Sequence, residues 1–377
     1  MPLDEPAWWY GPGEALWVRV LYPLEWLYAR QSVRRLTTRQ PYRSRLPVIC
    51  VGNFTAGGTG KTPLTLHLIQ RLLEMGETPA ILTRGYGGRL GGPHWVDPGK
   101  DSARDVGDEP LLLARTAPTL VSRDRRAGAI AIETAAADAS VILMDDGLQN
   151  PALIKDLTLA VVDAQRGLGN GHVIPAGPLR APLEVQVPLA DAIVLNGRPV
   201  GAIMEPQSAT HNRTDEQAEG RNIKDAATTR LATLRREFPG PVLAAHAEAR
   251  GDLSWLAGRH LIAFAGIANP QRFFSLIERC GGLIAERHTF KDHHGLSDEE
   301  ARHLITAAKT ADAALVTTEK DHVRLKGGGQ GVNELAHLAH TLPIGLVFED
   351  DDRQRIEALL AGALSTGGYR SGLNAQS

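Results

Sequence analysis

The stretch Gly52-Asn53-Phe54-Thr55-Ala56-Gly57-Gly58-Thr59-Gly60-Lys61-Thr62-Pro63 decides the fold of this 377-residue chain. Its three late glycines allow backbone conformations that a Cβ would forbid, so that successive N–H groups can converge on phosphate oxygens. Lys61 adds a mobile positive charge, and the Thr62 hydroxyl stands where it can bind Mg²⁺. We therefore expect a loop that binds a nucleoside triphosphate. The expected nucleotide-binding residues are Thr55, Ala56, Gly57, Gly58, Thr59, Gly60, Lys61 and Thr62.

The sequence on either side of this loop fits the interpretation. Pro47 to Val51 is a short apolar run typical of a buried strand, and apolar residues recur at helical spacing from Leu64 onward. The positive end of that helix would face the bound phosphates. Thr55 stands where the common form of the motif has its first glycine, so the loop is a variant. The competing interpretation is a glycine-rich turn with an incidental lysine.

Length and composition set the broad class of protein. With 377 residues, of which 43% are hydrophobic, the chain has material for about two or three domains. The net charge of −2 gives no general attraction to nucleic acid. Cys50 and Cys280 lie far apart in the sequence, which favours a reducing compartment over a disulfide scaffold. We expect no membrane span, because no run of about 18 apolar residues exists, and no cleavable signal sequence is evident.

The first 45 residues differ from the rest of the chain. They hold four of the six tryptophans, and between Arg30 and Arg45 there are six arginines and no acid. Aromatic rings suit the headgroup level of a bilayer, and six arginines near anionic lipid would contribute at most about 6 kcal/mol. We expect a helical, membrane-associating segment over residues 1–45. The competing interpretation is a helix docked on the body of the same protein, with its arginines in water.

Apolar strand patterns alternate with helical patterns through most of the chain. This alternation predicts an α/β fold, with a P-loop NTPase-type doubly wound, mostly parallel sheet and a second, smaller α/β domain. The expected ranges are 46–200 for the P-loop core, 201–230 for a polar linker or insertion, and 231–377 for the smaller domain, with a frayed tail from Ser365. The expected strands after the loop cover residues 80–83, 119–121, 141–144, 157–162, 192–195, 261–265, 314–317 and 344–348.

Two acidic pairs stand where catalytic or metal-binding carboxylates are common. Asp145-Asp146 closes an apolar strand, the position at which P-loop proteins hold Mg²⁺ or its water shell, although a solvated turn is the alternative. Asp108-Glu109 precedes an apolar helix, which these carboxylates could cap. A carboxylate there could instead accept the proton of a hydroxyl group during phosphoryl transfer.

Histidine and aspartate also cluster in Phe290-Lys291-Asp292-His293-His294. A metal site that includes His288 is one interpretation, but the spacing matches no zinc signature. A histidine that pairs with a catalytic carboxylate is the better interpretation.

These features together resemble the tetraacyldisaccharide 4'-kinase family, the lipid A 4'-kinases of Gram-negative bacteria. The similarity covers most of the chain, and one departure is Asn150, where the family usually has His. The motifs that carry the resemblance are Tyr22-Pro23-Leu24, the loop from Gly52 to Pro63, Thr83 to Gly88, Val106 to Pro110, Asp145 to Gln149, Gly169 to Gly171, Pro175 to Arg180, Asp292 to His294 and Thr317 to Asp321.

The resemblance implies a lipid kinase that transfers the γ-phosphate of ATP to the 4'-hydroxyl of a tetraacyldisaccharide 1-phosphate and yields lipid IVA. It implies ATP as co-substrate and Mg²⁺ as cofactor. It also implies a peripheral protein on the cytoplasmic face of the inner membrane, which binds the lipid disaccharide and an anionic membrane surface. We expect no nucleic-acid partner and no obligate protein partner.

The resemblance also assigns roles to residues by motif. Asp108 would be the catalytic base, His293 its partner, and Lys61 the side chain that stabilises the phosphates. The residues expected around Mg²⁺ are Thr62, Glu109, Asp145 and Asp146. The residues expected to bind the lipid substrate are Asn53, Arg84, Tyr86, Asn170 and Arg180.

Two rival functions use the same phosphate loop. A kinase of a soluble alcohol would leave the tryptophan- and arginine-rich first 45 residues unexplained. A nucleotide-dependent switch or chaperone would hydrolyse the nucleotide without phosphorylating a substrate. A guanine switch would normally carry Asn-Lys-x-Asp after a late strand, whereas Asn196-Gly197-Arg198 follows Leu195 here.

Overall fold

The computed structural model describes residues 5–10, 16–37, 40–136, 138–197 and 229–371. The chain forms two compact units, each assembled from separate stretches of sequence. Unit 1 comprises Met1–Lys61, Met144–His246 and Val347–Ser377, and unit 2 comprises Thr62–Leu143 and Ala247–Leu346. The predicted linker at 201–230 lies almost wholly outside the described residues. The ranges 46–200 and 231–377 stay a prediction for the domains of the protein.

Unit 1 is built on parallel strands. β6 (Leu157–Asp163) lies between β1 (Val48–Gly52) and β7 (Ala192–Asn196), and β7 pairs on its other edge with β8 (Val242–Ala249). Every residue of β1, β6 and β7 is buried. Burial on both faces explains why these strands have continuous apolar sequences rather than alternating ones. The strands predicted at 157–162 and 192–195 are confirmed.

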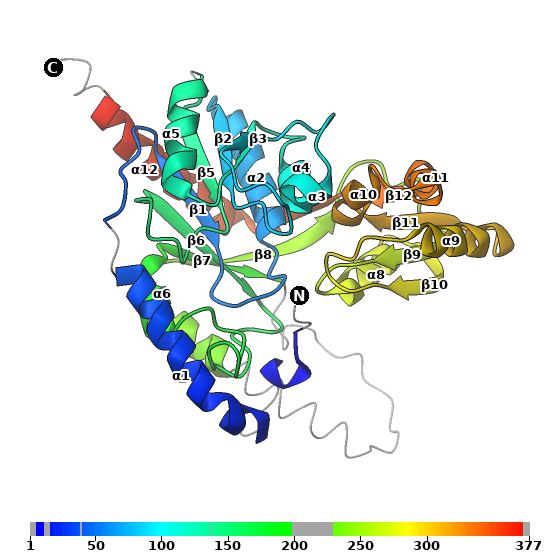
Figure 1. Cartoon of the computed structure of the whole chain (residues 1–377), viewed down its shortest axis with the longest axis horizontal. Helices are drawn as coiled ribbons and strands as arrows, with labels where there is room; N and C mark the ends of the chain where they lie inside the picture. The colour runs from blue at the N-terminus through cyan, green and yellow to red at the C-terminus, as the bar shows by residue number, and fades with distance from the viewer. Residues whose placement is uncertain (1–4, 11–15, 38–39, 137, 198–228, 372–377) are drawn as a thin grey trace. The chain divides into compact units, whose positions relative to one another are not determined.

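Helices cover the strands of unit 1. The long helix α12 (Asp350–Ser371) contacts β1 and β6 (Figure 1). Short helices α6 (Leu183–Gln186) and η2 (Val187–Leu189) pack with Phe54 and residues of β6 and β7 in one hydrophobic core. At its start, the chain forms η1 (Ala7–Tyr10) and then α1 (Leu16–Thr37).

The C-terminal helix differs from the sequence-based expectation. The glycine- and serine-rich tail was expected to fray from Ser365, but α12 continues to Ser371. Its inner face buries Ile356, Leu360 and Ala363, and this burial holds the helix against the unit.

Unit 2 contains two groups of strands. In the first, β2 (Pro79–Thr83) pairs in parallel with β4 (Thr119–Val121), which pairs antiparallel with β3 (His94–Trp95). The second is a parallel four-stranded sheet in the order β10-β9-β11-β12. Its strands are β9 (His260–Ala265), β10 (Leu283–Thr289), β11 (Ala314–Thr318) and β12 (His340–Leu342). β13 (Ile344–Phe348), expected as a strand of the smaller domain, is not one of these four.

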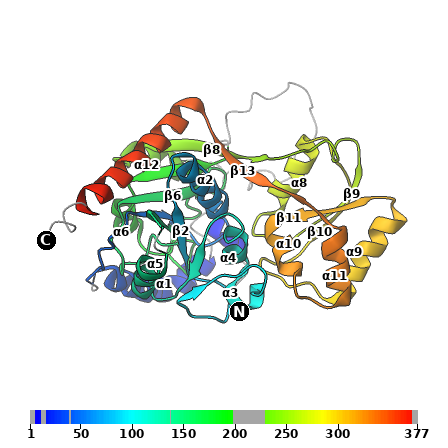
Figure 2. The same ribbon diagram turned by 90° about the horizontal axis from the view of Figure 1, so that it is seen from above.

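The helices of unit 2 follow its strands. The helix α8 packs on one face of the four-stranded sheet, and the helices α9 and α11 pack on its other face (Figure 2). α2 buries Leu64, Leu68, Ile69 and Leu72, as the helical spacing predicts. The helices are α2 (Lys61–Glu74), α3 (Ala103–Val106), α4 (Asp108–Leu113), α5 (Arg125–Ala135), α8 (Pro270–Arg279), α9 (Asp298–Thr310), α10 (Glu319–Leu325) and α11 (Gln330–Leu338).

The alternation of strands and helices confirms the predicted fold class. The protein has an α/β fold of the P-loop NTPase type with mostly parallel strands. The loop that follows β1 leads into α2, and β5 (Val141–Asp145) ends at the predicted acidic pair. Functional residues gather beyond the carboxyl ends of parallel strands in such folds.

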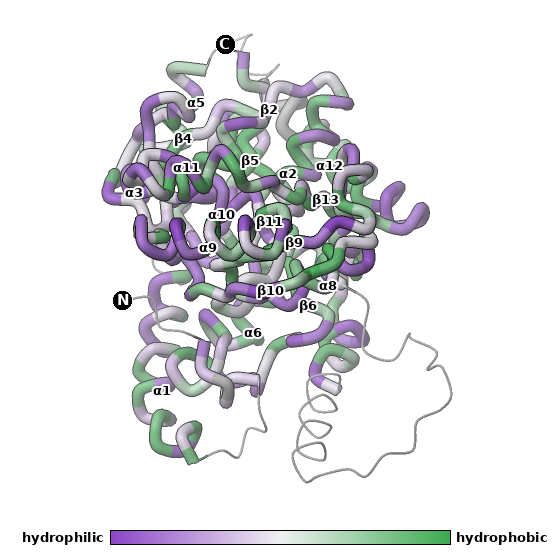
Figure 3. Tube along the Cα trace, turned by 90° about the vertical axis from the view of Figure 1, so that its right-hand side faces the viewer, coloured by the Kyte–Doolittle hydropathy of each residue, from purple (hydrophilic) through white to green (hydrophobic). Residues whose placement is uncertain are grey.

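The helix α1 leaves large hydrophobic side chains exposed. Trp17, Trp26 and Leu27 are 57%, 54% and 60% exposed. Figure 3 shows hydrophobic stretches in green along this helix. Among the described helices, none is long and apolar enough to cross a membrane.

Candidate active site

The phosphate loop of unit 1 is anchored by contacts at its two ends. Gly60 has a φ of 96°, and a Cβ there would come within 2.0 Å of the Asn196 amide nitrogen. That amide donates to the Thr59 carbonyl at 2.9 Å. At the other end, the Ala56 N–H donates to the Pro178 carbonyl at 2.7 Å. The end of β7 and the Pro175–Arg180 segment therefore fix the path of the loop.

Lys61 shares a carboxylate with Arg180. Asp146 Oδ1 lies 3.6 Å from Lys61 Nζ and 2.7 Å from Arg180 Nη1. Arg180 Nε also donates to the Thr55 carbonyl at 3.1 Å, so this arginine touches both the loop and the acidic pair. Asp145, at the end of β5, is only 2% exposed.

Two predicted substrate-binding residues of unit 1 are interior. Asn53 is fully buried, and neither polar atom of its amide has a hydrogen-bond partner among the described residues. Asn170 donates to the Ala176 carbonyl at 2.9 Å and to the Trp8 carbonyl at 3.3 Å. Asn170 therefore anchors η1 on the loop that follows β6.

A carboxylate from the start of the chain also lies at the phosphate loop. Gly57 has a φ of 96°, and a Cβ there would be 1.6 Å from Glu5 Oε1. The other oxygen of Glu5 accepts hydrogen bonds from Tyr10 at 2.8 Å and Arg166 at 2.7 Å. Sequence reasoning missed Glu5, because no motif marks it.

In unit 2, Asp108 stands at a sharp turn between two short helices. Gly107 joins α3 to α4 with a φ of 92°, and a Cβ there would lie 2.4 Å from the Tyr86 carbonyl oxygen. Only glycine fits this turn, which places Asp108 in the first turn of α4 with 4% exposure. Asp108 Oδ1 accepts a hydrogen bond from the Glu109 N–H at 2.9 Å.

The structure brings Asp108 and His293 together, 185 positions apart in the chain. His293 Nδ1 lies 3.0 Å from Asp108 Oδ2. The backbone of His293 has a φ of 62°, an unusual value for a residue other than glycine and one that often marks functional sites. The Tyr86 ring packs against the imidazole with 5.3 Å between ring centroids. Arg84, two residues earlier, is exposed beyond the end of β2.

Two cations of α10 complete this cluster. Arg324 Nε donates to Asp108 Oδ2 at 2.5 Å, and Lys320 Nζ lies 3.1 Å from Glu109 Oε1 and 4.0 Å from Asp108 Oδ2. Sequence reasoning gave neither residue a role. Lys320 belongs to the motif from Thr317 to Asp321, whereas Arg324 lies outside it.

The charges around Asp108 control its ionisation. Burial alone would raise the pKa of Asp108, but Lys320, the hydrogen bond from His293 and Arg324 together hold that pKa well below its usual range. Burial would likewise lower the pKa of Lys320, yet Glu109, Asp108 and Asp292 raise it above its usual value. Asp108 is therefore a carboxylate and Lys320 an ammonium at neutral pH.

The neighbouring His294 has a different environment. Its Nε2 lies 3.0 Å from Glu300 Oε1, and its ring stacks on Phe290 with 5.4 Å between centroids. Glu300 also forms the predicted capping box with Ser297 at the start of α9. Across the described ranges, no group of three or more His, Cys, Asp or Glu side chains is arranged to hold a metal ion. His294 thus supports the loop that carries His293.

The chain is similar to known proteins over nearly its whole length. A family model described as Tetraacyldisaccharide-1-P 4'-kinase (LpxK) matches residues 17–364. A protein of Methylobacterium nodulans named Tetraacyldisaccharide 4'-kinase is 44% identical over 357 residues, which cover 94% of this chain and 95% of that protein. A protein of Rhodopseudomonas palustris (strain BisB5) with the same name is 43% identical over 354 residues, covering 94% and 95%.

A solved structure has the same fold. The crystal structure of LpxK from Aquifex aeolicus in complex with ATP matches with a TM-score of 0.65 and 23% identity, covering 92% of this chain and 99% of that one. Because the family model spans most of the sequence and the named relatives exceed 40% identity, the chain belongs to the tetraacyldisaccharide-1-P 4'-kinase family.

Proposed function

We propose that the Asp108–His293 pair takes the proton from the 4'-hydroxyl of tetraacyldisaccharide 1-phosphate while that oxygen attacks the γ-phosphate of ATP. As a member of its family, the protein is an ATP-dependent kinase of lipid A biosynthesis. The observation that carries the proposal is the 3.0 Å contact between His293 Nδ1 and Asp108 Oδ2. A positioned proton acceptor of this kind contributes about 10²- to 10⁴-fold to a rate.

The phosphate loop would hold the donor. Its N–H groups and the N-terminus of α2 offer partial positive charge to the phosphates. Lys61 Nζ, now 3.6 Å from Asp146, would turn to the γ-phosphate and follow the charge that develops there during transfer. The hydrogen bond from Asn196 to the Thr59 carbonyl would keep the loop in shape.

The residues present fit a magnesium ion. Thr62 Oγ1 lies 3.5 Å from Glu109 Oε1, which offers a hydroxyl and a carboxylate oxygen next to the lysine of the loop. Mg²⁺ uses one or two carboxylates together with phosphate oxygens and water, so it needs no larger acidic cluster. We assign Thr62 and Glu109 to its immediate surroundings, and the part expected of Asp145 and Asp146 stays a prediction. When bound, Mg²⁺ would neutralise charge on the β- and γ-phosphates.

Two exposed residues beyond β2 suit the acceptor. Tyr86 packs against His293 and is 55% exposed, so part of its ring is available to the sugar that carries the reacting hydroxyl. Arg84 offers a planar guanidinium suited to the phosphate of the acceptor. Asn53, Asn170 and Arg180, although expected to bind the substrate, have the interior contacts described above. For them we propose support of the phosphate loop and of η1.

The helix α1 is the part of the chain that would meet the membrane. Its exposed tryptophans and leucines suit the level of lipid headgroups, and the arginines that follow suit anionic lipid. We propose peripheral association with the cytoplasmic face of the inner membrane through this helix, so that the acyl chains of the substrate stay in lipid.

Transfer of label from γ-labelled ATP to a tetraacyldisaccharide 1-phosphate acceptor tests the function. We expect label on the lipid with the wild-type protein, and a loss of about 10²-fold or more for Asp108→Ala and His293→Ala with ATP binding retained. The exposed substitution Arg302→Gln on α9 is the control and should transfer label normally. Label released only as free phosphate would identify a hydrolytic switch, and undiminished transfer by Asp108→Ala would exclude the pair as the proton acceptor.

A further inference from the structure

An ion pair between Glu5 and Arg166 lies at the phosphate loop of unit 1. Arg166 Nη1 is 2.7 Å from Glu5 Oε2, and the Tyr10 hydroxyl donates to the same oxygen at 2.8 Å. The guanidinium of Arg166 also lies over the Tyr10 ring, 4.9 Å from the ring centroid. Stacking on an aromatic face orients the plane of a guanidinium. The arginine is therefore held by a carboxylate and by an aromatic ring.

The other oxygen of Glu5 faces the backbone of the loop. A Cβ on Gly57 would be 1.6 Å from Glu5 Oε1, so the carboxylate lies directly against this glycine. Oε1 is buried and accepts no hydrogen bond from the described residues. A buried carboxylate oxygen without a donor is unfavourable, and the phosphates of a nucleotide would bring further negative charge to the same loop. Binding of a triphosphate therefore favours the departure of the Glu5 carboxylate from Gly57.

The backbone around this ion pair is anchored. The Arg166 N–H donates to Asp163 Oδ1 at 3.1 Å in the turn that follows β6, and β6 pairs with β1, which leads into the loop. The helix η1 is held by Trp9, whose Nε1 donates to the Pro175 carbonyl at 3.0 Å. Glu5 precedes η1 in the chain. Its side chain can therefore turn away from the loop while η1 and the turn that carries Arg166 stay in place.

The ion pair borders the part of the loop that serves the γ-phosphate. The helix η1 is hydrogen-bonded to the segment from Gly169 to Arg180. At the end of this segment, Arg180 pairs with Asp146, which also lies beside Lys61. Lys61 is the side chain that we assign to the γ-phosphate. We therefore expect the outer phosphate of a triphosphate, rather than the phosphates nearer the nucleoside, to lie next to Arg166.

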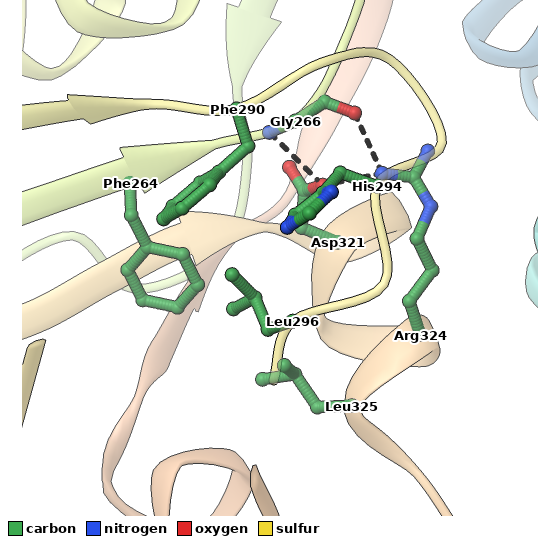
Figure 4. Close-up of a pocket in the computed structure, with 8 residues that line it drawn as sticks. All are labelled: Phe264, Gly266, Phe290, His294, Leu296, Asp321, Arg324 and Leu325. Atoms are coloured by element: carbon green, nitrogen blue, oxygen red, sulfur yellow. Dashed lines mark hydrogen bonds and ion pairs between the residues drawn. The ribbon is translucent and has the colours of Figure 1, made fainter. Parts of the chain in front are cut away.

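A cation that closes on a phosphate has to exchange its present partner. Arg324 in unit 2 is not suited to this, because its Nη1 donates to the Gly266 carbonyl and to Asp321 Oδ1, both at 2.6 Å, and its side chain is only 6% exposed (Figure 4). The side chain of Arg166 is 28% exposed, and its partner Glu5 is the group that a triphosphate repels. Arg166 is thus a cation that can change partners when the nucleotide binds.

We propose that Arg166 binds the γ-phosphate of ATP, and that the Glu5 carboxylate holds the arginine at the loop until the phosphate takes its place. Phosphate oxygens carry the same sign of charge as a carboxylate and bind a planar guanidinium through two parallel N–H donors. ADP lacks the γ-phosphate and would leave Arg166 with Glu5. The inference rests on the proposed function only in that ATP is the phosphate donor.

The test compares the affinities for ATP and for ADP in titration calorimetry, with Mg²⁺ present and lipid absent. We expect Arg166→Gln to raise the Kd for ATP by about 10-fold or more and the Kd for ADP by less than about 2-fold. Arg166→Lys keeps the charge but not the planar donors, so its Kd for ATP should lie between those of Arg166→Gln and the wild type. Arg236→Gln is the matched control, because Arg236 pairs with Glu237 at 3.2 Å in unit 1 and its side chain is 74% exposed.

A double-mutant cycle with Glu5→Gln separates phosphate binding from simple neutralisation of Glu5. If Arg166 contacts the γ-phosphate, Arg166→Gln should also raise the Kd for ATP by about 10-fold in the Glu5→Gln protein. If Arg166 only neutralises Glu5, the substitution should leave the Kd for ATP unchanged in that protein, and this result would overturn the inference.

The comparison with ADP supplies a second way to reject the inference. An equal rise in the Kd values for ATP and ADP would make Arg166 a support of the loop rather than a γ-phosphate ligand. Retained ADP binding shows that a variant is folded, and Arg166→Lys carries the same comparison with a smaller expected change. Normal label transfer by Asp108→Ala would contradict the proposed function but would not alter these affinities, so the two failures are distinguishable.

Discussion

Arg180 Nη1 donates to Asp146 Oδ1 at 2.7 Å, and the same oxygen lies 3.6 Å from Lys61 Nζ. One carboxylate oxygen is thus shared by two cations at the edge of the phosphate loop. Each cation weakens the hold of the carboxylate on the other. The strength with which Asp146 retains Lys61 therefore depends on Arg180.

Replacement of Arg180 should impair use of ATP. Arg180→Ala removes one of the two cations close to Asp146 and leaves Lys61, and the loop loses the Arg180 contact with the Thr55 carbonyl. We expect the KM for ATP to rise by about 3- to 10-fold, or roughly 1 kcal/mol. Arg180→Lys keeps the positive charge but lacks the planar guanidinium with its several N–H donors. The KM for ATP of this variant should therefore lie between those of Arg180→Ala and the wild type. A rise in the KM for the lipid with an unchanged KM for ATP would instead make Arg180 a substrate-binding residue.

Glu5 should oppose the binding of ATP. Its carboxylate lies against Gly57 of the phosphate loop, where a bound triphosphate would bring like charge. Glu5→Gln removes the charge and keeps the shape, so we expect the Kd for ATP to fall by about 2- to 10-fold in titration calorimetry. Asp350→Asn, at the exposed start of α12, removes one negative charge away from the loop motif and serves as the control. Equal affinities of Glu5→Gln and the wild type would contradict the prediction.

Acidic residues introduced in place of the exposed tryptophans of α1 should weaken membrane association. Trp17 and Trp26 are more than half exposed on this helix, and their loss removes apolar contact with lipid. The double substitution Trp17→Glu and Trp26→Glu should lower co-sedimentation with anionic liposomes by about 10-fold or more and raise the apparent KM for the lipid. Leu338→Glu, which changes an exposed leucine of α11, is the matched control. Undiminished co-sedimentation of the double variant would favour the docked-helix interpretation.

His67 should make the folded state less stable in acid. Burial, together with the charges of Arg250 and Arg71, lowers the pKa of His67 to about 4. The folded pKa lies below the unfolded one, near 6.5, so the unfolded chain binds a proton first as the pH falls between these values. The free energy of unfolding should decrease over that window by at most roughly 3 kcal/mol. His67→Gln should flatten this part of the pH dependence in urea denaturation, and an equally steep loss in the variant would assign it to other groups.

The sequence predicts the phosphate loop and the strands and helices around it because the residues that determine each of them are close together in the chain. The glycines, Lys61 and Thr62 act within a few residues of each other, and strands buried on both faces give continuous apolar runs. The Asp108–His293 pairing came from family resemblance, since no local pattern connects residues that are 185 positions apart.

The cations of α10 illustrate what a sequence cannot supply. Arg324 follows Asp321 by three positions, a spacing that predicts an ion pair within one helix. That it also reaches Asp108, 216 positions away, depends on how α10 packs against α4. Asn150, the departure from the family pattern, has a local explanation: its Oδ1 accepts from the Ala152 N–H at 2.9 Å, and its carbonyl accepts from Lys155 Nζ at 2.6 Å.

The placement of α12 has a consequence for biosynthesis of the protein. β1 and β6 leave the ribosome early, yet the helix that covers them is encoded by the last part of the chain. Before α12 begins, about 300 further residues must be synthesised after β1 and about 190 after β6, at a rate of roughly 5–20 residues per second. During that interval the apolar face of β1 and β6 is exposed on the nascent chain, so we expect chaperones to bind it. A chain that terminates before α12 should be degraded or aggregate rather than persist as a shorter kinase.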